Sequence, residues 1–146
     1  MQVSVRKIME GLGGDRFVKR PVRHEFDLIE IFKEGLPIES VAFLQNNFGF
    51  TNKEMSHILS ISESTYQRRI RAKAILTKDE TEKAISLSEL YAKGIDVFRN
   101  KANFENWLQT RIPAIGNQRP ADMLDLMIGR QQVMDELNRI LHGVFS

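Results

Sequence analysis

The sequence contains no cysteine and only three histidines, His24, His57 and His142, which lie far apart in the chain. The absence of cysteine excludes disulfide bonds, thiolate metal ligands and a cysteine nucleophile, and it is typical of proteins from a reducing cytoplasm. A zinc site needs several nitrogen or sulfur ligands that converge. Because no histidine has a second histidine or a cysteine at helical spacing, we expect neither a metal nor another cofactor.

Long hydrophobic runs are also absent. Charged residues interrupt every apolar stretch before it reaches the roughly 20 residues that a membrane-spanning helix needs. The N-terminal sequence MQVSVRKIMEGLGGDRFVKR lacks the apolar core and cleavage site of a signal peptide. The sequence therefore predicts a cytoplasmic protein without a membrane partner, and its hydrophobic content of 42% is enough for a packed core.

Residue patterns suited to catalysis are scarce. Asp79–Glu80 and Asp135–Glu136 are pairs of carboxylates, but adjacent residues on a helix point in different directions. The hydroxyl groups of Ser62, Ser64 and Thr65 have no base nearby in the sequence. With no catalytic triad and no phosphate-binding loop, the sequence does not predict an enzyme.

Apolar residues recur at helical spacing along almost the whole chain, and no segment shows the sustained alternation of a half-buried strand. The sequence therefore predicts an all-α fold. We expect an irregular arm over residues 1–23, where glycines and a proline interrupt regular structure, and a helix-turn-helix domain over residues 24–76. A smaller helical domain is expected over residues 77–146, packed against the helix-turn-helix domain because no flexible linker separates them.

Local signals place the helices within this fold. Phe26, Ile29 and Phe32 are expected on one side of a first helix near residues 24–34, which Gly35 ends. Capping boxes formed by Thr51 with Glu54 and by Thr77 with Glu80 open two later helices. Other helices are expected after Pro37, from Ser62 to about Ala74, around residues 104–108, after Pro120 and from about Gln131.

Residues 53–71, KEMSHILSISESTYQRRIR, have the layout of a helix-turn-helix. The second helix of this motif lies in the major groove, and its basic side chains and backbone amides hold phosphates. No acidic residue interrupts the basic stretch from Tyr66 to Lys78. The residues expected to face DNA are Ser62, Ser64, Gln67, Arg68 and Arg71. Gln67 could form two hydrogen bonds with adenine, and Arg68 or Arg71 could form two with guanine.

An ordinary helical hairpin with a solvated basic side is the alternative interpretation of this segment. Ser60 occupies the turn position that usually holds glycine. Glu63 would lie near phosphate, although a carboxylate can also accept a hydrogen bond from cytosine.

From Ser62 to Ser146 the chain resembles the Xre/MbcA/ParS-type antitoxins. The resemblance rests on the stretches STYQRRI, LTKDETEKAISL, NWLQT, PAIGNQRPADMLD and GRQQVMDELNRILHGVFS, which occur in this order, and on the region around Phe98. Two positions depart from the family pattern. Gln118 and Arg119 precede Pro120 where the family has a small residue and a hydroxyl N-cap, and the apolar run Leu126–Ile128 replaces polar residues. The second departure suggests an apolar contact surface.

The resemblance implies that the C-terminal region covers the active-site entrance of a RES-domain toxin that consumes NAD. It implies toxin contacts by Gly129, Arg130, Arg139, His142, Val144, Phe145 and Ser146. From the residues alone, Val144 and Phe145 could equally fold back onto the core of their own domain.

Two hypotheses of different kinds follow. The first is an antitoxin that binds a RES-domain toxin and operator DNA, acting as a homodimer because a single helix-turn-helix contacts only one half-site. The second is a stand-alone transcriptional regulator whose C-terminal domain dimerises or binds another protein.

Overall fold

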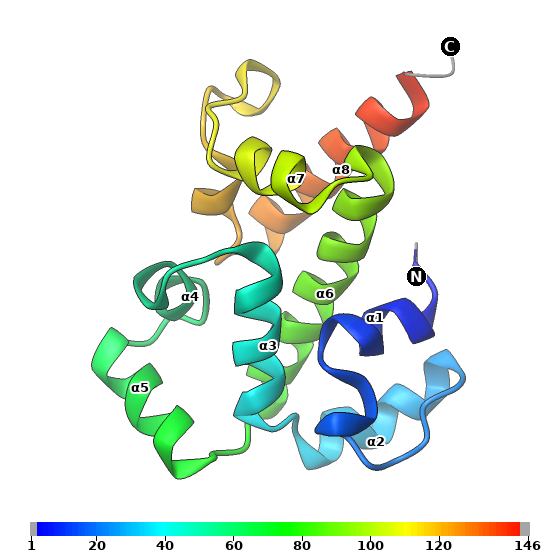
Figure 1. The fold of residues 1–146 in the computed structure, drawn as a ribbon, viewed down its shortest axis with the longest axis vertical. Coiled ribbons are helices and arrows are strands. Elements are labelled where there is room, and N and C mark those ends of the chain that lie inside the picture. The colour runs from blue at the N-terminus through cyan, green and yellow to red at the C-terminus, as the bar shows by residue number, and fades with distance from the viewer. Residues whose placement is uncertain (1–2, 144–146) are drawn as a thin grey trace.

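The computed structural model describes residues 3–143, which form an all-α fold without strands, as the sequence predicts (Figure 1). The eight α-helices are α1 (Val5–Gly11), α2 (Leu28–Glu34), α3 (Ile38–Phe48), α4 (Asn52–Ile58), α5 (Glu63–Ala72), α6 (Lys78–Phe98), α7 (Lys101–Leu108) and α8 (Met127–Gly143). Short 3-10 turns occur at Gly14–Arg16, Glu25–Asp27, Pro113–Ile115 and Pro120–Met123. Within residues 3–143 no helix has the length and apolar character needed to cross a membrane.

The predicted helix starts are confirmed where a side chain caps the backbone. The Glu54 amide donates to Thr51 Oγ1 at 3.1 Å, and the Thr51 amide donates to the Glu54 carboxylate at 2.9 Å. Thr77 and Glu80 form the same reciprocal pair at the start of α6. These bonds satisfy amide groups that an uncapped helix would leave without partners.

Helix α6 is the central element of the fold. It packs against α1, α2 and α3 in one half of the molecule and against α7 and α8 in the other (Figure 1). Its buried side includes Thr81, Ala84, Leu87 and Leu90. Because one continuous helix supplies core residues to both halves, the helix-turn-helix domain and the C-terminal domain pack together, as predicted.

The expectation of an irregular arm over residues 1–23 is wrong for residues 5–11, whereas residues 12–23 are irregular apart from the short turn Gly14–Arg16. Residues 5–11 form α1, in which Ile8 is fully buried. The Ser88 hydroxyl on α6 donates to the Ile8 carbonyl at 2.6 Å. A Cβ atom on Gly11 would lie only 2.4 Å from Ser88 Oγ, so this glycine permits close helix packing rather than breaking the helix.

The prediction that Phe26, Ile29 and Phe32 line one side of the first helix is wrong for Phe26 and Ile29, whereas Phe32 is partly buried and packs against the core. Helix α2 begins at Leu28, and Phe26 lies in the preceding 3-10 turn. Leu28 and Ile31 are buried, whereas Phe26 and Ile29 are 67% and 51% exposed. The later start changes which residues face the core.

Two predicted helix starts in the C-terminal domain also differ from the structure. The last helix begins at Met127, one turn before the predicted Gln131, and Pro120 opens a 3-10 turn instead of an α-helix.

Candidate DNA-binding and toxin-binding surfaces

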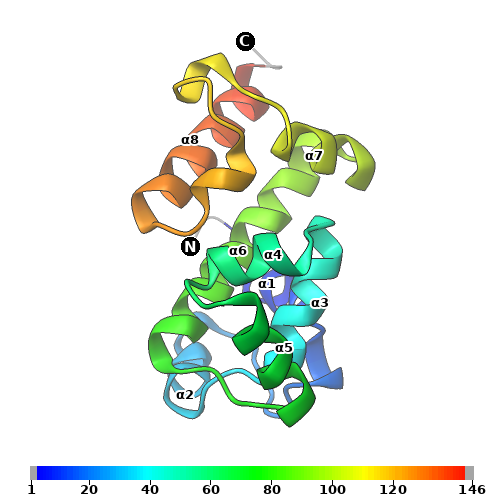
Figure 2. The same ribbon diagram turned by 90° about the vertical axis from the view of Figure 1, so that its left-hand side faces the viewer.

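Helix α5 presents its outer side to solvent at the lower end of the molecule (Figure 2). All five residues predicted to face DNA are exposed: Ser62, Ser64, Gln67, Arg68 and Arg71. Tyr66 is fully buried on the opposite side of the helix. The helix is therefore oriented with its polar and basic side outward, which is the orientation that major-groove binding requires.

Tyr66 fixes this orientation through α3. Its hydroxyl donates to Gln45 Oε1 at 2.5 Å, and Gln45 Nε2 donates in turn to the Phe50 carbonyl and to Asn52 Oδ1. Burial raises the pKa of the Tyr66 hydroxyl, so the group remains a neutral donor. A buried aromatic ring with a satisfied polar end holds α5 against α3 and against the start of α4.

Arg69 belongs to the fold rather than to the exposed basic surface. Its guanidinium lies 2.5 Å from Glu80 Oε2, and the two side chains are 29% and 15% exposed. Burial acts to raise the pKa of Glu80, but hydrogen bonds from Thr77 and Arg69 outweigh it and the pKa is lowered. This ion pair ties α5 to the start of α6, and Arg68 and Arg71 remain on the outside.

The turn between α4 and α5 accommodates Ser60 in place of the usual glycine. Ser60 adopts a left-handed conformation with φ of 61°. The Ser60 amide donates to the His57 carbonyl and the Ile61 amide to the Ser56 carbonyl, each at 3.0 Å. This pair of bonds is a Schellman motif, which satisfies the last carbonyls of α4. Ser62 then caps α5 by accepting from the Thr65 amide at 3.1 Å.

Gly129 and Arg130, both predicted to contact a toxin, make contacts within their own domain. A Cβ atom on Gly129 would lie 1.9 Å from the Met123 carbonyl oxygen, so the first turn of α8 approaches the preceding backbone very closely. Arg130 donates to Ser86 Oγ at 3.1 Å and to the Leu124 carbonyl at 2.9 Å. Burial lowers the pKa of Arg130. In the sequence, the signal that could have indicated this close packing is the position of Gly129 inside a helical pattern.

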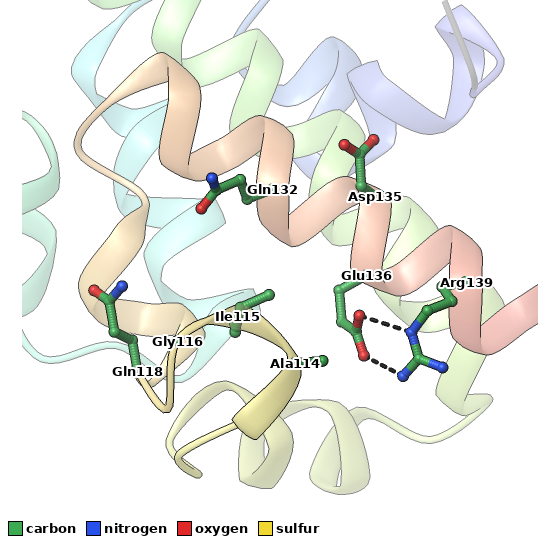
Figure 3. Close-up of a pocket in the computed structure, with 8 residues that line it drawn as sticks. All are labelled: Ala114, Ile115, Gly116, Gln118, Gln132, Asp135, Glu136 and Arg139. Atoms are coloured by element: carbon green, nitrogen blue, oxygen red, sulfur yellow. Dashed lines mark hydrogen bonds and ion pairs between the residues drawn. The ribbon is translucent and has the colours of Figure 1, made fainter.

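A cleft of about 470 Å³ lies between α8 and the loop that contains the Pro113–Ile115 turn (Figure 3). Its lining residues are Ala114, Ile115, Gly116, Gln118, Gln132, Asp135, Glu136 and Arg139. The Glu136 side chain is 6% exposed and accepts two hydrogen bonds from Arg139, from Nε at 2.9 Å and from Nη2 at 2.5 Å. Neither the burial of Glu136 nor its pairing with Arg139 was predicted from the sequence.

The end of α8 carries the remaining predicted toxin contacts. His142 is exposed in its last turn. Val144, Phe145 and Ser146 lie outside the described residues. At the start of the same helix, Leu126, Met127 and Ile128 are 61%, 76% and 63% exposed. These three residues form the apolar surface that the departure from the family pattern suggested.

Polar contacts join the two domains beside α4. Gln109, at the end of α7, donates to Glu54 Oε2 at 2.9 Å. His57 Nε2 lies 3.7 Å from Asp125 Oδ2. Despite these contacts, α5 and the last turn of α8 lie at opposite ends of the long axis in both views (Figures 1 and 2). The two candidate surfaces are therefore well separated in one continuous structure.

Comparison with known proteins assigns a family to each part of the chain. Residues 27–88 match the antitoxin Xre-like helix-turn-helix domain. Residues 93–143 match the antitoxin Xre/MbcA/ParS C-terminal toxin-binding domain. The two matches meet within α6, which both halves of the fold share.

Similar proteins carry corresponding names. The chain is 31% identical over 117 residues to an antitoxin Xre of Photorhabdus laumondii, covering 80% of this chain and 79% of that protein. It is 23% identical to an antitoxin Xre of Yersinia enterocolitica, with 82% and 81% covered. A Prs ADP-ribosylating antitoxin of a Sphingobium species is 22% identical over 82% of this chain and 81% of that protein. The chain therefore belongs to the Xre/MbcA/ParS family and is the antitoxin of a toxin–antitoxin pair.

Proposed function

We propose that this antitoxin neutralises a RES-type toxin that consumes NAD, by covering the entrance to its active site, and that it represses its own operon through α5. The separation of α5 from the end of α8 supports both activities, because a toxin bound at one end leaves the other end accessible to DNA. The name of the Sphingobium relative, a Prs ADP-ribosylating antitoxin, supports a toxin of the RES type. Neutralisation of this kind needs no catalytic group in the antitoxin.

Operator recognition is proposed to use the exposed side of α5. Gln67 would pair with adenine, and Arg68 or Arg71 with guanine, through two hydrogen bonds each. The start of the helix and Ser62 and Ser64 would hold the phosphate backbone. Because Tyr66 and Arg69 already fix α5 against α3 and α6, the helix is oriented before DNA arrives, and less ordering accompanies binding.

Replacing both Arg68 and Arg71 by alanine is expected to weaken operator binding while toxin binding is unchanged. Each base contact contributes about 1–3 kcal/mol of discrimination. Each lost phosphate contact lowers the slope of log affinity against log salt by about 1. Mobility-shift titrations at several salt concentrations measure both effects. A double variant of the exposed residues Arg6 and Lys101, which lie on α1 and α7, removes the same charge from other helices and serves as control.

DNA affinity that is equal in the Arg68/Arg71 variant, the control and the unmodified protein would refute α5 as the operator-binding helix. An equal loss of affinity in both variants would instead indicate a general effect of net charge.

A homodimer is the proposed DNA-binding form, because two helix-turn-helix units read two half-sites about one helical turn apart. The exposed apolar run Leu126–Ile128 is a surface suited to a protein contact. Light scattering at micromolar concentration is expected to report twice the mass of the chain. A monomeric mass both with and without operator DNA would contradict the proposal.

A further inference from the structure

The pair formed by Glu136 and Arg139 is unequal in exposure. The Glu136 side chain is 6% exposed, whereas the Arg139 side chain is 66% exposed at the edge of the cleft (Figure 3). A buried carboxylate is costly unless its oxygens are hydrogen-bonded and its charge is paired. Arg139 provides both, since it donates to each carboxylate oxygen. Glu136 in turn fixes the direction of a long side chain that would otherwise sample many conformers.

Arg139 has hydrogen-bonding capacity beyond this pair. A guanidinium carries five N–H donors, and Glu136 accepts from Nε and Nη2. Within residues 3–143, Arg139 Nη1 has no acceptor. A guanidinium held in a fixed plane loses less conformational freedom when it binds an acceptor. Because Glu136 already neutralises the charge of Arg139 and Asp135 also lines the cleft, Arg139 is prepared to bind a further neutral acceptor, a carbonyl oxygen.

The rest of the cleft has the chemistry of a site for a polypeptide segment. Gln118 and Gln132 line it and offer amide donors and acceptors, which match the groups of an exposed backbone. Its volume of about 470 Å³ falls within the range of ligand sites, about 300–1,000 Å³. Every lining residue also falls within the matched toxin-binding domain, residues 93–143.

We propose that a segment of the toxin enters this cleft and places a backbone carbonyl oxygen against Arg139, and that Glu136 is the positioning residue for Arg139. This inference rests on the proposed neutralisation of a toxin. It places the toxin contact that the resemblance implies for Arg139 in a defined cleft, and it assigns a positioning role to Glu136, which the toxin does not itself touch.

A double-mutant cycle tests the positioning role. The probe is the purified toxin encoded beside the gene for this chain, and calorimetry measures its affinity for Arg139→Ala, Glu136→Gln and the double variant. Arg139→Ala is expected to weaken binding about 10-fold, which is about 1.4 kcal/mol. Glu136→Gln is expected to weaken it about 3-fold in the unmodified background and to have no further effect beside Arg139→Ala. Effects that multiply independently would overturn the positioning role.

Controls separate this role from effects on folding. Arg119 and Asp122 form another two-bond pair three residues apart in the same domain, and neither lines the cleft. Arg119→Ala and Asp122→Asn are expected to leave toxin affinity unchanged. If thermal denaturation shows that Arg139→Ala is unstable, Arg139→Lys keeps the charge but loses the planar two-bond geometry, and toxin binding should still weaken.

Failure of the proposed function and failure of the cleft assignment give different results. An unmodified antitoxin that does not bind the toxin refutes the proposed function. An unmodified antitoxin that binds, with folded Arg139 variants that bind equally well, refutes only the assignment of the cleft.

Discussion

Replacing Gly129 by alanine is expected to destabilise the protein by about 3 kcal/mol, because a Cβ atom at this position would lie 1.9 Å from the Met123 carbonyl oxygen. The obstacle is backbone and cannot rotate away. Either α8 or the Pro120–Met123 turn must move, and Arg130 would then lose its hydrogen bond to the Leu124 carbonyl. Thermal denaturation should show a midpoint lower by about 6–12 °C. Toxin neutralisation should decline more than DNA binding, since the displaced elements belong to the C-terminal domain.

Gly143→Ala on the same helix is the matched control. A Cβ atom there meets nothing within 4 Å among the described residues. Its effect on the unfolding free energy is expected to stay within about 0.5 kcal/mol. Equal stability of the Gly129 and Gly143 variants would show that the close approach of α8 to residue 123 does not limit stability.

Removing Val144, Phe145 and Ser146 is expected to abolish toxin neutralisation while folding and DNA binding are preserved. The resemblance to the family implies that these residues enter the toxin's cleft, with Phe145 as an apolar anchor. Truncating an anchor at the centre of an interface costs about 2 kcal/mol or more, on the order of a 30-fold loss of affinity. Growth rescue upon co-expression with the toxin, together with co-purification, measures the effect.

The alternative, in which Val144 and Phe145 pack on the antitoxin's own core, gives a different order of events. Thermal stability would fall first, and DNA binding and neutralisation would then decline together. Phe145→Ala is a smaller change than the truncation and distinguishes the two interpretations. A toxin anchor predicts weaker neutralisation at unchanged thermal stability, whereas core packing predicts lower thermal stability. The assignment would be overturned if the truncated protein were unstable, or if it rescued growth as well as the full chain.

The sequence by itself determined the features that depend on neighbouring residues. Thr51 and Thr77 could be identified as helix caps because each bonds to an amide three residues later, within the same turn. Helical periodicity predicted that Arg68 lies on the exposed side of its helix, because this follows from the position of a single helix. The order of short motifs identified the family, which the matches over residues 27–88 and 93–143 confirm.

Only the tertiary structure decided the features that join distant parts of the chain. Arg68 and Arg69 are adjacent and equally basic, but Arg69 lies beside Glu80, so only Arg68 remains exposed. The glycine-rich start of the chain becomes a core helix because Ser88 of α6 lies against it. The cleft exists because the loop containing the Pro113–Ile115 turn lies across α8 from Glu136. A capping bond spans three residues and can be inferred from a short window of sequence. The partners of Arg69 and Ile8 are set by how α5 and α1 pack against α6, and the cleft beside Glu136 is set by how the Pro113–Ile115 loop packs against α8. No short window of sequence contains these contacts.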